Sequence, residues 1–244
     1  YTRTGIKERR IADADHSTSD LCKVASERAM QAADVKPEDI DLIILATITP
    51  DTHCPAGSNW LEAKLKCNNA VSFDITAACS GFIFALHVAD KMIRCGVNKN
   101  VLVVAGEIMS RVVNWKERES CILWGDGAGA AVITETDEGA EIMSTHIHTD
   151  GENGDTLLMP GGGSKTTPIS YESVDKGKHF LKMIEANKSF KVAVSRFAEA
   201  CEEAVATNGY TIDDVDVIVP HQANLRILQG MAKKLKVPME KVYM

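Results

Sequence analysis

The sequence predicts an α/β fold made of two similar halves, and two features of its 244 residues support this. Short apolar runs alternate with stretches in which apolar residues recur at helical spacing, which indicates a largely buried sheet covered by helices. In addition, residues 33–44 align without gaps with residues 208–219, and both contain Asp-Ile/Val-Asp followed by branched aliphatic residues. Helix–turn–strand units are common and short matches arise by chance, but the shared pattern favours a duplication.

The apolar runs and helical patterns assign the elements in order. The expected strands are Asp41–Thr47, Ala70–Ile75, Asn100–Glu107, Ala128–Thr134 and Asp216–Pro220. The expected helices are Asp20–Ala33, Ser58–Lys66, Gly81–Cys95, Ser189–Thr207 and Ala223–Leu235. Turn residues at Lys36–Asp39, Asp126–Gly127 and Asn208–Gly209 separate them.

The boundary between the halves is expected near a glycine-rich loop. Pro160-Gly161-Gly162-Gly163-Ser164 opens the longest loop-like stretch, which runs to about Gly177. We therefore expect an N-terminal half at 1–160 and a C-terminal half at 161–244. Applying the spacing of the first half to the second places further strands beyond Met244, so we expect a fragment with open sheet edges that folds poorly alone.

Composition excludes several classes of protein. The chain is 45% hydrophobic and 25% charged, which is ordinary for a soluble globular protein. Its formal net charge of −7 argues against a nucleic-acid surface. No apolar run approaches the ~18 residues of a membrane span, and there is no secretory signal pattern. The seven cysteines form an odd set without a CxxC pair, which indicates reduced thiols rather than disulfides or zinc ligands.

Cys79 lies where a predicted strand passes into a predicted helix, among small residues. The positive end of the helix dipole and its unpaired N–H groups favour a thiolate there, so we expect a lowered pKa; lowering it from ~8.5 to ~7 would raise the ionised fraction at pH 7 from about 3% to about half. The same N–H groups can hold the oxyanion of a thioester under attack. A buried packing cysteine is the alternative, but the position favours a nucleophile.

His221 occupies the matching junction of the second half, between the strand Asp216–Pro220 and a helix. Polar residues just beyond the carboxyl end of a buried strand are where open α/β sheets place their sites. A lone histidine is more often structural, but its position in the repeat matches that of Cys79. We therefore interpret it as a partner in catalysis.

Three motifs in this order resemble those of β-ketoacyl-acyl-carrier-protein synthase III. They are Asp74–Phe82, Gly125–Ala130 and His221–Arg226, and the opening Thr2–Arg9 is also similar. Enzymes of this family are thiolase-fold condensing enzymes that start fatty-acid synthesis. The resemblance implies a thiolase-like, layered α-β-α-β-α fold of two duplicated halves, the second of them incomplete in this chain.

The resemblance also implies a mechanism. Cys79 would accept an acyl group from acyl-coenzyme A, and malonyl-acyl-carrier protein would then lose carbon dioxide and attack the acyl-enzyme. His221 would donate a hydrogen bond to the thioester oxygen, for which a neutral imidazole suffices. The family's third catalytic residue, an asparagine, would lie beyond Met244, so we expect the fragment alone not to complete the condensation.

Further residues are assigned by the same resemblance. Arg3 and Arg118 match positions that contact coenzyme A, Asn224 lies in the substrate channel, and Arg226 lies at its mouth. Lys191, Arg226, Lys233 and Lys234 would form a basic patch for the acidic carrier protein, although Lys233 and Lys234 also fit a solvated helix face. The resemblance suggests a cytoplasmic homodimer without a cofactor, and Cys54 would shape the partner's pocket or be an ordinary loop cysteine.

Two other motifs have simpler interpretations. Gly125-Asp126-Gly127-Ala128-Gly129 lacks the lysine of a phosphate loop and the third glycine of a dinucleotide fingerprint, so we expect a tight turn and a close-packed strand. His146 and His148 would share one face of a strand near Asp150, but without further ligands we predict no metal site.

Two alternative functions stay open from the sequence. One is a related thiolase-fold acyltransferase or condensing enzyme of specialised metabolism that uses a different acceptor. The other is a catalytically incomplete homologue that acts only as a binding partner, although the presence of both Cys79 and His221 argues against it.

Overall fold

The computed structural model describes residues 4–137, 139–165 and 167–244. The chain forms two compact units. The first, here called the sheet unit, comprises Arg10–Ser110 and Gly125–Ile147. The second, here called the helix-pair unit, comprises residues 4–9, Arg111–Trp124 and His148–Met244. Each unit is described below by itself.

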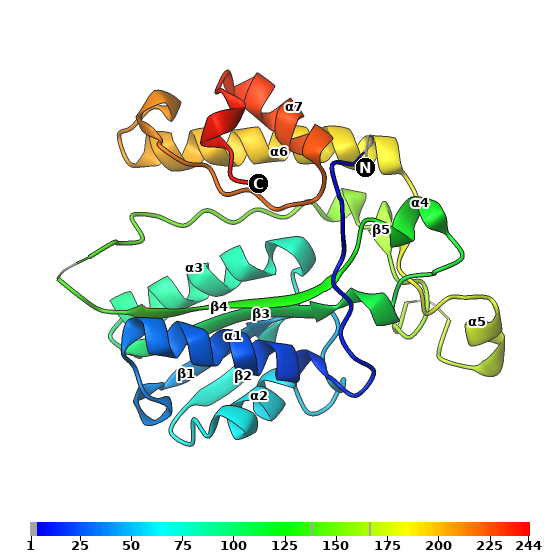
Figure 1. Ribbon diagram of the computed structural model, residues 1–244, viewed down its shortest axis with the longest axis horizontal. Helices are drawn as coiled ribbons and strands as arrows, with labels where there is room; N and C mark the ends of the chain where they lie inside the picture. The colour runs from blue at the N-terminus through cyan, green and yellow to red at the C-terminus, as the bar shows by residue number, and fades with distance from the viewer. Residues whose placement is uncertain (1–3, 138, 166) are drawn as a thin grey trace. The chain divides into compact units, whose positions relative to one another are not determined.

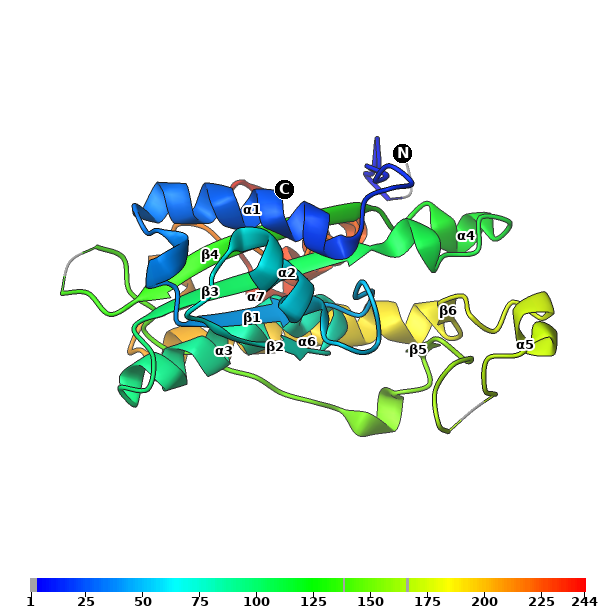
Figure 2. The same cartoon turned by 90° about the horizontal axis from the view of Figure 1, so that it is seen from below.

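The sheet unit is built on a four-stranded sheet in the order β2-β1-β3-β4. Its strands are β1 (Leu42–Ala46), β2 (Val71–Ile75), β3 (Asn100–Ile108) and β4 (Asp126–Thr134). β1 pairs in parallel with both β2 and β3, and β4 is antiparallel to β3. All five residues of β1 are buried, as expected for a central strand that is covered on both faces. Figure 2 shows β1, β3 and β4 running side by side.

Helices cover both faces of this sheet, as Figure 1 shows. On one face lie α1 (Thr18–Ala33) and α2 (Gly57–Leu65), whose Cys22, Met30, Leu61 and Leu65 join alternate residues of β1 and β3 in one core cluster. On the other face lies α3 (Gly81–Arg94), where Ala85 and Ala89 pack against the remaining strand residues. The two faces use alternate residues because successive strand side chains point in opposite directions.

Two carboxylates determine where α1 and α2 begin. The side chain of Asp20 accepts a hydrogen bond of 2.8 Å from the backbone N–H of Ser17, which closes a capping box at the start of α1. At the start of α2 the cap comes from another element, because the Asp74 carboxylate of β2 accepts bonds of 2.7 Å and 2.8 Å from the N–H groups of Gly57 and Ser58. These N–H groups have no partner within the helix, so an anionic acceptor stabilises it.

The helix-pair unit packs two long helices against a short apolar segment. These are α6 (Ala186–Thr207) and α7 (Leu225–Leu235), and their core includes Ala198, Leu228 and Met231. The unit also contains the short helices α4 (Arg118–Cys121) and α5 (Tyr171–Asp175) and an antiparallel pair of two-residue strands, β5 (Leu157–Leu158) and β6 (Lys182–Met183). Helix α5 lies inside the stretch that the sequence suggested was all loop.

Nine of the ten predicted long elements are present in the structure, and the strand Asp216–Pro220 is the exception. There the described chain forms one isolated bridge, between Ile218 and Val242. Ile218 is buried, whereas Val217 and Val219 are 56% and 74% exposed. The strand prediction from the aliphatic pattern is wrong here, because a strand also needs a ladder of partner residues, and this bridge is the one β-pairing of the segment among the described residues.

The two copies of the internal repeat have the same local structure. In each copy a helix is followed by a short 3₁₀ turn, Pro37–Asp39 in the first and Ile212–Asp214 in the second. The last aspartate of each turn accepts a hydrogen bond from a backbone N–H three residues earlier, at Lys36 and at Thr211. The shared Asp-Ile/Val-Asp pattern is therefore a structural unit that leads the chain out of a helix.

Among the described residues, no helix is both long enough and apolar enough to cross a lipid bilayer.

Candidate active site

Cys79 lies between β2 and α3, as the sequence predicts. After β2 ends at Ile75, the 3₁₀ turn Ala78–Ser80 carries Cys79 directly into Gly81, the first residue of α3. Ala78 has a φ of 45°, which is rare for a residue with a side chain, and such conformations cluster at functional sites. Cys79 itself is exposed. A sharp turn thus places Cys79, which is exposed as a residue, at the carboxyl edge of the sheet.

Close packing fixes the helix that follows Cys79. A Cβ placed on Gly81 would lie 2.8 Å from the Cβ of Ala46, the last residue of β1. Only glycine allows α3 to approach the strand this closely. The first turn of α3 therefore rests on the end of β1, which determines the height of Cys79 above the sheet.

The prediction that the helix lowers the pKa of Cys79 is wrong. Although the residue is exposed, protein atoms around the sulfur desolvate the thiolate and raise its pKa, and the negative charge of Glu107 raises it further. A hydrogen bond from the backbone of Cys79 acts in the opposite direction but does not outweigh them. The resting cysteine is accordingly a thiol at neutral pH, and its proton has to be transferred as the sulfur attacks.

Glu107 is a site residue that the sequence analysis missed. It lies near the carboxyl end of β3, and the pairing of Ala46 with both Ile75 and Ala105 brings the ends of β1, β2 and β3 to one edge of the sheet. Desolvation raises the pKa of the Glu107 carboxyl, although three groups of the Thr47–Thr49 segment donate hydrogen bonds to it. An acidic residue ending an otherwise apolar strand was the signal that could have revealed it.

His221 lies in the helix-pair unit, in the short segment between Ile218 and α7. Desolvation lowers its pKa, and the positive charge of Arg9 lowers it further. Both effects favour a neutral imidazole, which is the form required of a hydrogen-bond donor in the predicted mechanism. Cys79 belongs to the sheet unit, so the meeting of these two residues stays a prediction.

Asn224 and Arg226 begin α7. The Asn224 side chain accepts a hydrogen bond of 3.1 Å from the N–H of Ile227 and so caps the helix. Arg226 is exposed in the first turn. The channel roles predicted for these residues stay predictions, and capping is the role of Asn224 that its contacts define.

The predicted basic patch lies on α6 and α7. Lys191, Lys233 and Lys234 are all exposed. Val194 packs against Gly230, and Lys234 approaches Glu199 at 3.3 Å, so the two helices run in the same direction and Lys191 lies towards the Arg226 end. The negative charge of Glu199 offsets part of the positive charge that Lys234 contributes to the patch. Glu199 also pairs with Arg196.

The predicted coenzyme A residues are partly described. Arg118 is exposed in α4 of the helix-pair unit. Arg3 lies outside the described residues. Their contacts with a substrate stay predictions, as does the role of Cys54, which is exposed in the loop before α2.

The expectation of a tight turn and close packing at Gly125–Gly129 is wrong. Asp126 already begins β4, and a Cβ on Gly127 or Gly129 would meet nothing within 4 Å. The close approach occurs instead on β3, where a Cβ on Gly106 would collide with the sulfur of Cys22. The beginning of β4 borders an open hollow of about 540 Å³.

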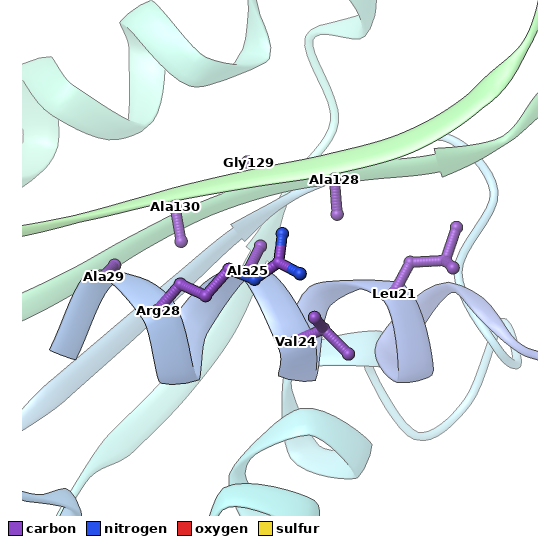
Figure 3. A pocket seen from close by; sticks show the side chains of 8 residues that line it. All are labelled: Leu21, Val24, Ala25, Arg28, Ala29, Ala128, Gly129 and Ala130. Carbon is purple, nitrogen blue, oxygen red and sulfur yellow. The ribbon is translucent and has the colours of Figure 1, made fainter. Parts of the chain in front are cut away.

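That hollow lies between α1 and β4 and contains none of the predicted site residues (Figure 3). Its lining is mostly small and apolar, with Arg28 as the charged exception. The lining residues are Leu21, Val24, Ala25, Arg28, Ala29, Ala128, Gly129 and Ala130.

His146 and His148 do not share a strand, which corrects the sequence expectation. Residues 139–150 are described and none of them belongs to a strand. His146 bonds to Ser144 at 2.9 Å, and His148 bonds to Glu203 at 2.6 Å. A different group, Asp13, Asp15 and His16, brings its side-chain atoms within 4.8 Å of one another, but all three are exposed and nothing else there indicates an ion.

Comparisons with known proteins agree with the resemblance seen in the sequence. Two models of 3-oxoacyl-[acyl-carrier-protein] synthase III match, the first at residues 73–151 and the C-terminal one at residues 205–244. The chain is 46% identical over 242 residues to β-ketoacyl-[acyl-carrier-protein] synthase III of Caldanaerobacter subterraneus, covering 99% of this chain and 72% of that protein. It is 44% identical to the Clostridioides difficile enzyme, with 99% and 73% covered.

Solved structures give the same result. The crystal structure of 3-oxoacyl-[acyl-carrier-protein] synthase III from Aquifex aeolicus is 39% identical, with a TM-score of 0.88 over 99% of this chain and 73% of that one. The priming β-ketosynthase of the R1128 polyketide pathway is 35% identical, with a TM-score of 0.85 over 99% and 71%.

The fold and the cysteine at the end of β2 define a thiolase-fold condensing enzyme. Enzymes of this class are acyltransferases that build carbon–carbon bonds. The chain belongs to the β-ketoacyl-acyl-carrier-protein synthase III family, whose members initiate fatty-acid synthesis.

Proposed function

We propose that Cys79 is the nucleophile of a condensation between an acyl-coenzyme A primer and malonyl-acyl-carrier protein. The observation that carries this proposal is the position of Cys79, an exposed thiol on a sharp turn between β2 and α3, inside the segment that matches the family. A helix start presents backbone N–H groups of the kind that can hold the oxygen of a bound thioester, although the N–H of Gly81 here also donates to the carbonyl of Ala78.

In the first step, the sulfur of Cys79 attacks the thioester carbonyl of the primer. A tetrahedral oxyanion forms and collapses, the bond to coenzyme A breaks, and the proton lost by the cysteine ends on the sulfur of coenzyme A. Because the pKa of Cys79 is raised, this proton transfer is part of the step rather than complete beforehand.

In the second step, malonyl-acyl-carrier protein loses carbon dioxide, and the resulting carbanion attacks the acyl carbonyl on Cys79. The thioester bond to Cys79 then breaks, so that the β-ketoacyl chain stays on the carrier protein and the sulfur leaves as a thiolate, which takes up a proton from solvent. His221 donates a hydrogen bond to the thioester oxygen as negative charge develops there. The lowered pKa of His221 supports this role, since the neutral ring keeps one N–H to donate and does not take a proton from solvent at pH 7.

The proposed partners follow from charge and family. Arg3 and Arg118 would bind the phosphates of coenzyme A, Asn224 would line the channel, and Arg226 would lie at its mouth. Lys191, Arg226, Lys233 and Lys234 would attract an acidic carrier protein and increase the association rate. We also propose a homodimer in the cytoplasm, with Cys54 at the subunit contact, and a division of the chain into halves at 1–160 and 161–244.

Mass spectrometry after incubation with acetyl-coenzyme A tests the proposal. An acetyl adduct is expected on Cys79 and should be absent from Cys79→Ser. Cys95→Ser is the matched control, because Cys95 is an exposed cysteine at the other end of α3 and its loss should leave the adduct unchanged. Acetylation spread equally over Cys54, Cys79 and Cys95 would show chemical reactivity only and would exclude the proposed role.

A second candidate function is polyketide priming, which the 35% identity to the R1128 priming ketosynthase favours. The first step would be the same, and the acceptor would differ. Acetyl-Cys79 presented with malonylated carrier proteins from the two kinds of pathway distinguishes the candidates, since the fatty-acid carrier protein is expected to discharge it faster.

A further inference from the structure

Glu107 lies at the edge of the sheet where β1, β2 and β3 end and where Cys79 follows β2. It extends from the carboxyl end of β3, next to the turn that follows β1, while Cys79 follows β2. Among the described residues, Glu107 is the charged side chain that acts electrostatically on the Cys79 thiol.

The Glu107 carboxylate receives hydrogen bonds from three consecutive residues. The N–H of Ile48 donates at 2.8 Å and the hydroxyl of Thr47 donates at 3.2 Å. The hydroxyl of Thr49 donates to the same carboxylate and accepts a bond of 2.9 Å from the N–H of Ile108. A single side chain of β3 therefore holds all three residues of the Thr47–Thr49 turn.

Neighbouring elements fix the turn from other sides. The hydroxyl of Thr18 in α1 donates to the carbonyl of Thr49 at 2.5 Å, and the N–H of Thr47 donates to the carbonyl of Ile75 at 3.2 Å. Ile75 is the last residue of β2 before the segment that contains Cys79. The turn thus links Glu107 to the strand that delivers the nucleophile.

The same turn supports the helix that follows Cys79. Ala46 directly precedes it, and Ala46 is the residue on which Gly81 rests. Movement of the turn would displace Ala46, and with it the first turn of α3 and the N–H groups beside Cys79.

We propose that Glu107 is a positioning residue for Cys79. The carboxylate of Glu107 holds the Thr47–Thr49 turn and thereby fixes Ala46, on which the first turn of α3 rests. This inference rests on the proposed role of Cys79. It has two separable components. One is the length of the Glu107 side chain, which forms the clamp, and the other is its negative charge, which acts on the Cys79 thiol.

The electrostatic surroundings allow the charge of Glu107 to be tested. The other titratable groups in this part of the sheet unit are Cys22 of α1, Asp51 of the loop after β1, Asp74 of β2 and Lys64 of α2. Asp51, Asp74 and Lys64 act with Glu107 on Cys22, but only Glu107 also raises the pKa of Cys79. Removing the Glu107 charge should therefore move the ionisation of Cys79 to lower pH.

Two substitutions separate the components. Glu107→Gln keeps the length and removes the charge, and a threonine hydroxyl can reverse to accept from the new amide. The alkylation of Cys79 by iodoacetamide, followed by mass spectrometry, should then be at least about threefold faster at pH 7. Glu107→Asp keeps the charge and shortens the side chain, so the pH profile of alkylation should stay close to that of the wild type while acetyl transfer from acetyl-coenzyme A slows about tenfold.

Glu62→Gln is the matched control, because Glu62 accepts a hydrogen bond from Ser72 of β2 but does not act on Cys79. Its alkylation profile and acetyl transfer should equal those of the wild type. If Glu107→Gln fails to fold by circular dichroism, Thr49→Val replaces it, which removes one bond of the clamp and should slow acetyl transfer without moving the alkylation profile.

The inference is overturned if Glu107→Gln gives the same alkylation profile as Glu62→Gln, or if Glu107→Asp and Thr49→Val transfer acetyl at the wild-type rate. Failure of the wild type to form acetyl-Cys79 would instead refute the proposed function. In that case the alkylation profiles would still decide whether Glu107 faces the thiol.

Discussion

Ala46 and Gly81 are in direct contact although they lie 35 positions apart in the sequence, since a Cβ at position 81 would lie 2.8 Å from the Cβ of Ala46. This contact joins the end of β1 to the start of α3, one residue after the turn that contains Cys79. It explains why a helix can begin so close to the sheet at this point.

Gly81→Ala should therefore force α3 away from β1. We expect a net loss of about 1–2 kcal/mol in the free energy of unfolding, because two methyl carbons cannot approach to this distance without a backbone shift. Urea denaturation measures this loss, and acetyl transfer to Cys79 should slow in parallel. Gly127→Ala is the control, since its new Cβ would meet nothing within 4 Å. Equal stability of the two variants would disprove the contact.

Asp74→Ala should destabilise α2 from a distance. The carboxylate accepts hydrogen bonds from the N–H groups of Gly57 and Ser58, so its removal leaves two donors at the helix start without an acceptor. We expect a loss of about 1–2 kcal/mol by urea denaturation. Asp74→Asn retains one acceptor oxygen, so its free energy of unfolding should lie between those of the wild type and Asp74→Ala. An alanine variant as stable as the wild type would show that water replaces the cap.

The pKa of His221 should rise when the charge of Arg9 is removed. Desolvation lowers this pKa first and Arg9 lowers it further, so in Arg9→Gln only the desolvation remains. We expect the ring-proton titration followed by NMR to move to higher pH while staying below the ordinary value of about 6.5. Arg226→Gln, which removes an exposed cation from the same unit, should not move it. A shift in both variants would indicate a general change of net charge.

Asp20 should make the protein sensitive to acid. Desolvation tends to raise its pKa, but hydrogen bonds from Lys64 and Ser17 outweigh this, so the folded-state pKa lies below the unfolded one. A group of this kind contributes stability above its unfolded pKa of about 4 and loses that contribution as the pH falls further. The difference in unfolding free energy between the wild type and Asp20→Asn should be largest near pH 7 and shrink below about pH 4. Asp13→Asn, at an 84% exposed side chain, should show no such trend.

The sequence predicted the parts of the fold that local patterns encode. β1 and β3 form continuous apolar runs because both faces of the sheet are covered, and α1 and α3 show helical spacing because each has a single buried face. The strand Asp216–Pro220 carries the same local signal, yet its residues form one bridge, because ladder partners are not encoded in the strand itself.

The position of Cys79 could also be predicted from sequence, but its ionisation could not. The expected thiolate followed from the helix start alone, whereas the pKa of Cys79 depends on surrounding atoms and on Glu107, which lies 28 positions further along the chain. In the same way, Asp74 caps a helix that begins 17 residues earlier in the sequence. Interactions of this kind become visible only once the strands are placed beside one another.

The seven cysteines differ in accessibility, so labelling of their thiols can report on different parts of the protein. Cys22 and Cys67 are sealed in the core, and burial raises the pKa of Cys22 to about 12 and that of Cys67 to about 11, whereas Cys54, Cys79 and Cys95 are exposed. Replacing Cys54 and Cys95 by serine would leave Cys79 as the most accessible site for a fluorophore or spin label. The sealed pair would then label only when the sheet unit opens, so one reagent could follow occupancy of the nucleophile and unfolding of the core in a single sample.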